Sequence, residues 1–165
     1  MKKITFLFAF ISALVLTSCS SDDDGAIVEV TNQISYAGTV VNVSEAEVED
    51  FGTTTEQGYY NLDFTVSGTN DNVPYEFYAE LFSPVSGENA VFTPGTFNFS
   101  ATTPDNPAFH FNIVTLRVDG ITFDAIGGTV TISGGENNNY TIVADIQLNN
   151  NEMVTVSFSG TFTEI

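Results

Sequence analysis

Residues 140–162, near the end of the chain, alternate apolar and polar side chains with a period of two, and few folds accept that pattern. The residues that share one face over 140–148 and 154–162 are Tyr140, Ile142, Ala144, Ile146, Leu148, Val154, Val156, Phe158, Gly160 and Phe162. Such alternation is typical of antiparallel strands with one buried face, and Asn149-Asn150-Asn151 supplies a turn between them. A slip of one residue would expose every apolar side chain, so the sequence predicts a hairpin of fixed register. In that register Phe158 faces the core and Ser157 faces outward.

The rest of the chain continues in the same style, with short apolar runs separated by Gly, Pro, Asn and Asp and with no long helical pattern. We expect further strands at 34–43, 60–67, 73–82, 97–101, 109–118 and 130–132. The fold class is therefore predicted as all-β: one antiparallel domain of eight to ten strands, spanning residues 34–165. An up-and-down barrel and a sandwich both satisfy this pattern, and periodicity alone does not separate them.

Two segments leave local alternatives open. Ser44-Glu45-Ala46-Glu47 fits either one helical turn with a capping box or the start of a strand, and we favour the strand because so short a helix would not be stable alone. The apolar phase shifts between Phe109 and Val118, which predicts a bulge or bend within one strand.

The predicted strand 73–82 carries large apolar side chains on both faces. Tyr75, Phe77, Ala79 and Leu81 share one face, whereas Tyr78 and Phe82 lie on the other. Such a strand is either covered on two sides or lines a cavity. We therefore predict Tyr78 and Phe82 as ligand-binding residues, with burial against a second sheet as the alternative. The lack of Trp weakens a carbohydrate-stacking role, although Tyr and Phe also present a ring face.

The N-terminal segment predicts export. Met1-Lys2-Lys3 is basic, and the apolar run 4–16 is shorter than the ~20 residues that span a bilayer, so residues 1–18 are predicted as a signal peptide. Leu16-Thr17-Ser18-Cys19 resembles the bacterial lipobox, whose cysteine is diacylated and becomes the first mature residue. The resemblance implies a membrane anchor through lipid on Cys19. The alternative is a free thiol, and with a single Cys no intrachain disulfide can form.

The residues after Cys19 are acidic. Ser21, Asp22, Asp23 and Asp24 resemble the export signal of Bacteroidota lipoproteins, which implies the lipoprotein export machinery as a partner and an outer-membrane location facing the cell exterior. A solvated linker is the alternative. Residues 19–33 are thus predicted as a lipidated acidic tether, which becomes strand-like at Ala26-Ile27-Val28-Glu29-Val30.

The predicted domain itself resembles small Bacteroidota lipoproteins of a calycin-like or sandwich type. The similarity lies in short strand-and-turn patterns at 44–52, 92–97, 127–130 and 158–160. It implies a fold and a location and carries over no catalytic residue.

The charge balance excludes polyanionic partners. Removing Lys2 and Lys3 with the signal peptide leaves Arg117 against 21 acidic residues, and 1 minus 21 gives −20. Nucleic acids require Lys and Arg to neutralise phosphates, so no nucleic-acid partner is expected. Because 42% of residues are hydrophobic, this charge does not predict disorder.

No catalytic constellation is recognisable, and we predict no enzymatic activity. His110 is the sole histidine, and we interpret it as structural. Asp63, Glu76 and Glu80 are predicted on a solvated sheet exterior. We predict no cofactor and no metal site, because zinc needs Cys or His ligands and EF-hand spacing is lacking, although turns at Asn70-Asp71-Asn72 and Asp119 hold oxygen ligands suited to calcium.

The predicted function is a lipid-anchored envelope protein that binds a small-molecule or glycan ligand or has a structural role. The alternative is a carboxylate-dependent hydrolase acting on glycans outside the cytoplasm.

The lipobox assignment makes one direct prediction. Replacing Cys19→Ser should leave folding intact and abolish membrane retention, because two acyl chains are needed for stable anchoring and Cys19 lies outside every predicted strand. Metabolic labelling with a fatty acid should mark only the wild type. Label on the variant would contradict the assignment.

Overall fold

The computed structural model describes residues 30–54, 58–85, 90–104 and 108–165, and this part of the chain is almost entirely β. The predicted lipidation and export-signal residues, Cys19 and Ser21 to Asp24, lie outside the described residues. The elements are β1 (Gln33–Tyr36), β2 (Thr39–Asn42), β3 (Glu45–Thr53), β4 (Tyr59–Asn70), β5 (Val73–Pro84), β6 (Gly95–Phe99), β7 (His110–Phe111), β8 (Val114–Val118), β9 (Ile121–Gly134), the 3-10 turn η1 (Glu136–Asn138), β10 (Asn139–Leu148), β11 (Met153–Thr161) and β12 (Thr163–Glu164).

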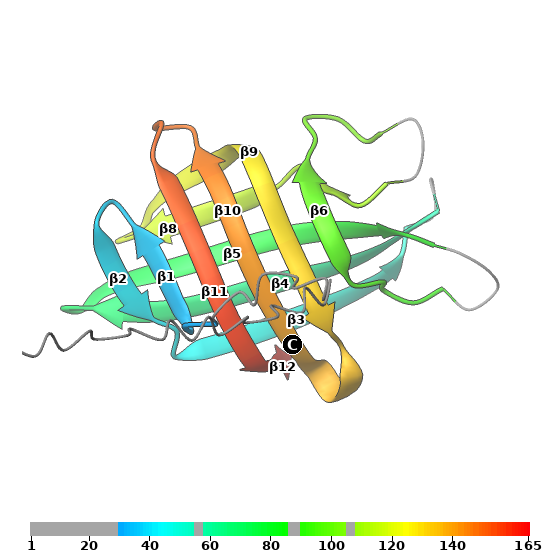
Figure 1. Cartoon of the computed structure of the whole chain (residues 1–165), viewed down its shortest axis with the longest axis horizontal. Helices are drawn as coiled ribbons and strands as arrows, with labels where there is room; N and C mark the ends of the chain where they lie inside the picture. Colours follow the sequence, from blue (N-terminus) through cyan, green and yellow to red (C-terminus); the bar gives the residue numbers. More distant parts are fainter. Residues whose placement is uncertain (1–29, 55–57, 86–89, 105–107) are drawn as a thin grey trace, which may run out of the picture.

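The twelve strands form one continuous sheet that folds back on itself. Figure 1 shows β9, β10 and β11 crossing in front of β3, β4 and β5 as two layers. On one side β8 joins the layers by pairing with both β5 and β9, and β6 and β7 form a second link there. On the other side β12 runs on from β11 and pairs with β3. The all-β prediction is confirmed, and the sheet has the wrapped form of a barrel-like domain.

The strand count and direction differ in detail from the expected eight to ten antiparallel strands. Two of the twelve strands, β7 and β12, are only two residues long. These two make the parallel pairings, β7 with β6 and β12 with β3, and all other pairings are antiparallel.

Hairpin turns of one type join several of the strands. Ala37-Gly38, Asp71-Asn72 and Asp119-Gly120 each place two successive residues at positive φ, between 47° and 80°. Two-residue loops of this kind match the right-handed twist of the flanking strands. The turn predicted at Asp119-Gly120 is therefore confirmed.

The core lies between the two layers and is filled by side chains from both. Phe64, Phe77, Phe97, Phe111 and Phe162 are each less than 2% exposed. The ring of Phe64 on β4 meets those of Tyr140 and Phe162 edge to face, with centroids 5.0 and 5.4 Å away. Such pairs add about 0.5–1.5 kcal/mol each beyond the area they bury.

The C-terminal hairpin has the predicted register. Ile142 pairs with Phe158 and Ala144 with Val156, and a turn connects the strands at 149–151. Phe158 faces inward and meets Phe162 at 5.3 Å, but it is only half-buried. The predicted inward orientation of Phe158 is confirmed and its ring packs against the core, but the side chain stays half-buried because Phe158 lines a gap in the sheet described below.

Two local predictions are resolved. Residues 45–53 form β3, so the strand interpretation of this segment is confirmed. The segment 109–118 is two strands and not one strand with a bulge. The reason is a change of partner, because β7 lies between β6 and β5 whereas β8 lies between β5 and β9.

Among the described residues no helix is long and apolar enough to cross a membrane.

Burial predicts how three substitutions rank in stability. Phe64→Ala should lower the free energy of unfolding by about 3–5 kcal/mol, as loss of a buried aromatic side chain does. Thr155→Ala, on the exposed face of β11, should stay within about 0.5 kcal/mol of the wild type. Phe158→Ala should fall between them. Denaturant melts measure all three, and a Phe158→Ala cost equal to that of Phe64→Ala would contradict the half-buried position.

Candidate functional site

Tyr78 and Phe82 lie on the outer face of β5, with their side chains half-buried. Their inward neighbours Phe77, Ala79 and Leu81 are fully buried, so the predicted division of this strand into two faces is correct. Glu80 lies between Tyr78 and Phe82 on the same outer face. The two candidate ligand-binding residues therefore flank the carboxylate of Glu80 on the same face of the strand.

Tyr78 is tied to a carboxylate on the neighbouring strand. Its hydroxyl donates a short hydrogen bond to Oδ2 of Asp63, and Nδ2 of Asn61 donates to Oδ1 at 2.8 Å. Asp63 is only 5% exposed, so the prediction of a solvated position was wrong. The side chains of Tyr78 and Asn61 hold Asp63 between them, a contact that the alternation pattern does not predict.

The environment of Asp63 favours its protonated form. Burial raises the pKa of this carboxyl, the hydrogen bonds from Tyr78 and Asn61 lower it, and the charge of Glu49 raises it, with a net shift upward. Burial and the bond to Asp63 also raise the pKa of the Tyr78 hydroxyl well above its ordinary value. At neutral pH the tyrosine therefore remains a donor.

Three carboxylates form a row across the outer face. The sheet register places Glu49 of β3 opposite Asp63 of β4, and Asp63 opposite Glu80 of β5. Burial, and then the charge of Asp63, raise the pKa of Glu80. Glu76, by contrast, is exposed and lies opposite Arg117 of β8. Within this row, Asp63 and Glu80 thus bind protons more readily than ordinary surface acids do.

Phe82 belongs to an aromatic group beside this row. Its ring stacks on the imidazole of His110 at 5.1 Å and 18°, and the Tyr59 ring meets the imidazole edge-on at 4.7 Å. His110 is 4% exposed, and Nδ1 lies 3.0 Å from the carbonyl oxygen of Ala108. These contacts agree with the structural role expected for His110.

A groove opens at one end of the wrapped sheet, and we call it the mouth groove. Its volume is about 350 Å³. The residues that line it are Asp50, Tyr60, Leu62, Val91, Phe92, Pro94, Gly134, Gly135, Glu136 and Tyr140.

The polar groups of the mouth groove are fixed in position. The Tyr60 hydroxyl donates to Oδ2 of Asp50 at 2.7 Å, and the amide of Gly52 donates to Oδ1 at 2.8 Å. The hydrogen bond to Asp50, together with burial, raises the pKa of Tyr60 to about 12. Burial also raises the pKa of Tyr140, with smaller effects from Asp50 and Glu164. Both hydroxyls therefore stay protonated at neutral pH.

Part of the wall of the mouth groove is apolar or lacks side chains. Phe92 stacks on the buried Phe97, with centroids 5.6 Å apart and the planes within 6°. Gly134 and Gly135 adopt φ values of 87° and 121°, and a Cβ on Gly134 would overlap the carbonyl oxygen of Asn139. Glycine is needed there because an L side chain fits neither the dihedral angles nor the space. The peptide backbone thus forms part of the wall.

Sequence reasoning missed the mouth groove. It placed Tyr140 on the core face of its strand, which is correct, but periodicity does not show where a strand leaves the packed interior. The Gly134-Gly135 pair is the one sequence signal of an open backbone wall. Bringing Tyr60, Phe92 and Tyr140 together required the wrapping of the sheet.

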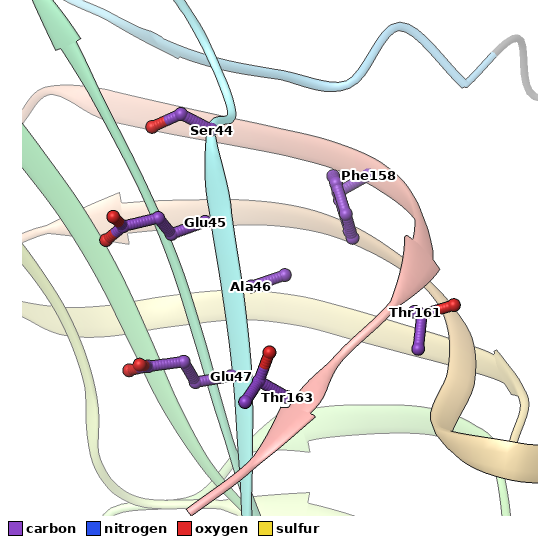
Figure 2. A pocket seen from close by; sticks show the side chains of 7 residues that line it. All are labelled: Ser44, Glu45, Ala46, Glu47, Phe158, Thr161 and Thr163. Atoms are coloured by element: carbon purple, nitrogen blue, oxygen red, sulfur yellow. The ribbon is translucent and has the colours of Figure 1, made fainter.

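A second groove, of about 390 Å³, lies where β3 faces β11, and we call it the seam groove. Figure 2 shows its lining residues, Ser44, Glu45, Ala46, Glu47, Phe158, Thr161 and Thr163. The carboxylates of Glu45 and Glu47 point to the opposite side of β3 from Ala46 (Figure 2). Ala46 thus lies on the side of β3 that faces Phe158, and Ser44, Thr161 and Thr163 add hydroxyl groups to the lining.

Within the described ranges, no group of three or more His, Cys, Asp or Glu side chains could hold a metal ion.

Comparison with protein-family models, with curated proteins and with solved structures found no match to this chain.

The raised pKa of Asp63 predicts a pH dependence of stability. As the pH rises from 3.8, the unfolded chain releases this proton before the folded protein does, so the contribution of Asp63 to stability falls toward neutral pH. Asp63→Asn keeps the hydrogen-bonding side chain and cannot ionise. Its free energy of unfolding should therefore rise relative to the wild type as the pH increases.

Urea melts across this pH range measure the difference. Asp119→Asn is the matched control, because Asp119 is exposed in a turn whose positive φ suits asparagine. If the free energy of unfolding changed with pH in the same way for the wild type and for Asp63→Asn, burial would not raise the pKa of this carboxyl.

Proposed function

We propose that the protein is a lipid-anchored binding protein of the outer membrane, facing the cell exterior, that holds a small uncharged or cationic ligand such as a sugar unit and catalyses no reaction. The lipobox-like Leu16-Thr17-Ser18-Cys19 and the acidic segment that follows support the anchor and the location. Lipid on Cys19 and the export machinery are its proposed partners on the membrane side.

The mouth groove is the observation that carries the binding role. It joins ring surfaces from Tyr60, Phe92 and Tyr140 to hydroxyl donors and to the fixed carboxylate of Asp50. A binding pocket typically has mostly apolar walls and a few well-placed polar groups, with a volume of roughly 300–1,000 Å³. At about 350 Å³ this groove suits one small ligand or one unit of a longer chain.

The charges around the groove set the class of ligand. Asp50 and Glu136 line it, and Glu164 is close enough to raise the pKa of Tyr60 and Tyr140. An anionic ligand would meet repulsion from all three carboxylates. A neutral polyol or a cation would find hydrogen-bond acceptors in the same groups.

A ligand-binding role for Tyr78 and Phe82 is a separate proposal on the outer face of β5. The Tyr78 hydroxyl is engaged by Asp63 and one ring face of Phe82 by His110, so a ligand there would use the remaining exposed ring surface. This leaves the mouth groove as the better equipped of the two sites.

The alternative function is a carboxylate-dependent hydrolase acting on glycans. The observation that favours it is the Asp63 and Glu80 pair, which lies in cross-strand register with both pKa values raised, as a general acid requires. Against it, Asp63 is enclosed by Tyr78 and Asn61 and is nearly inaccessible to a substrate. Glycan turnover lost in Glu80→Gln would favour the hydrolase.

Ligand binding tests the proposed function. We expect a screen of neutral and amino sugars against the full-length protein in detergent to yield a ligand, and Tyr60→Phe to weaken its binding about 2- to 13-fold. Loss of one hydrogen bond costs about 0.5–1.5 kcal/mol, which corresponds to that range. Isothermal titration calorimetry provides the affinities.

Tyr36→Phe is the matched control. Tyr36 loses a comparable hydroxyl, one bonded to Asn150 at 2.7 Å, but it does not line the mouth groove. Equal weakening by both substitutions, or no binding by any sugar in the screen, would contradict the proposed site.

A further inference from the structure

The side chains that line the mouth groove in the described part of the chain offer more hydrogen-bond acceptors than donors. The acceptors are the carboxylates of Asp50 and Glu136 and the phenol oxygens of Tyr60 and Tyr140. Of these lining side chains only the two tyrosines can donate, and the Tyr60 hydroxyl already donates to Oδ2 of Asp50. A ligand that donates hydrogen bonds therefore suits the groove better than one that accepts them.

The carboxylate of Asp50 is held in place and can still accept from a ligand. Its Oδ1 accepts from the amide of Gly52 at 2.8 Å, and its Oδ2 accepts from the hydroxyl of Tyr60 at 2.7 Å. An ionised carboxylate has about four lone-pair sites, so each oxygen retains capacity for a further hydrogen bond. The amide of Gly135, in the glycine wall, is already used by the carbonyl oxygen of Asn139 at 2.8 Å.

The negative charge at the mouth groove has no neighbouring Lys or Arg within the described ranges. Arg117 is the one basic residue of that kind there, and it pairs with Thr122 near the start of β9. The groove lies at the other end of this strand, at Gly134. A cationic ligand would therefore supply the positive charge that Asp50 and Glu136 lack.

Aromatic rings stand beside these carboxylates. The rings of Tyr60 and Phe92 lie with centroids 6.5 Å apart and planes at 65°. Phe97 stacks on one face of Phe92, so the ring surface that remains belongs to the groove. A cation within about 6 Å of a ring centroid is attracted to the face of the ring, and the carbon skeleton of a small ligand packs on the same surface.

The two tyrosine hydroxyls respond to the same charges. The hydrogen bond to Asp50 and burial raise the pKa of Tyr60 to about 12, and the charges of Asp50 and Glu164 add to the rise. Burial raises the pKa of Tyr140, and the charges of Asp50 and Glu164 again add to it. A negative potential that opposes a phenolate favours a bound cation.

We propose that the mouth groove selects a small primary amine in its protonated form, such as an amino sugar, over an uncharged polyol of the same size. The ammonium group donates to Asp50 while the skeleton lies against the rings of Tyr60 and Phe92. An ammonium carries three donors and no acceptor, which matches the groups that the groove presents. This inference rests on the binding role proposed for the groove and narrows the class of its ligand.

A pair of sugars that differ at one carbon tests the selection. D-glucosamine carries an ammonium group, at a pH below the pKa of its amine, where D-glucose carries a hydroxyl. Isothermal titration calorimetry on the full-length protein in detergent should show glucosamine binding about tenfold or more tightly, because hydrogen bonds to charged groups are the stronger ones. Equal binding of the two sugars would overturn the selection and leave the binding role standing. Binding of neither would overturn both.

Asp50→Asn connects the preference to the groove. The substitution keeps an acceptor for the amide of Gly52 and removes the charge. Glucosamine affinity should fall about tenfold, whereas glucose affinity should change by about twofold or less. Asp119→Asn is the matched control, because it removes one charge in the exposed turn before β9, at the opposite end of that strand from the groove. Equal weakening of both sugars by Asp50→Asn would contradict the proposal.

Two further measurements do not depend on the folding of the Asp50 variant. Glu136 is exposed in the 3-10 turn at the rim of the groove, and Glu136→Gln should reduce the preference for glucosamine about twofold or more. Added salt should weaken glucosamine and spare glucose, because it screens the charges. A preference that neither Glu136→Gln nor salt reduces would overturn the proposal.

Discussion

The contact between β4 and the C-terminal strands, made by the rings of Phe64, Tyr140 and Phe162, holds the two layers of the sheet together. The three rings meet only because their strands keep a strict alternation of inward and outward side chains. A slip in register in either layer would therefore separate the rings. The mouth groove forms where this packing ends, since Tyr140 lines the groove with its accessible edge while its body belongs to the core. Core packing and the proposed binding site therefore share a residue.

The outer face of the sheet is not a uniformly solvated acidic surface. Glu49, Asp63 and Glu80 stand in one row because the pairing of β3, β4 and β5 is in register, and the middle carboxylate is nearly fully enclosed. A charge in that position is costly, and the hydrogen bonds from Tyr78 and Asn61 reduce the cost. The same hydrogen bonds that make Asp63 tolerable keep it away from solvent, which is why we assign binding to the mouth groove and not to this row.

The two grooves have different origins. The mouth groove lies at one end of the wrapped sheet. The glycines at 134 and 135 and the residues around Phe92 leave space there beside the packed aromatic rings. The seam groove is a defect in pairing, because β1 and β12 each cover only part of the strand edges that face one another. The polar groups held in position in the first support the proposed binding role.

The sequence by itself determined the β class, the register of the 140–162 hairpin, the turn at Asp119-Gly120 and the two-faced character of β5, because alternation and turn chemistry are local properties. Only the tertiary structure decided the burial of Asp63, the half-exposure of Phe158 and the meeting of Tyr60 with Phe92 and Tyr140. Those depend on which strands become neighbours and on where their pairing stops. A period-two pattern says which way a side chain points; it does not say whether another part of the chain lies over it.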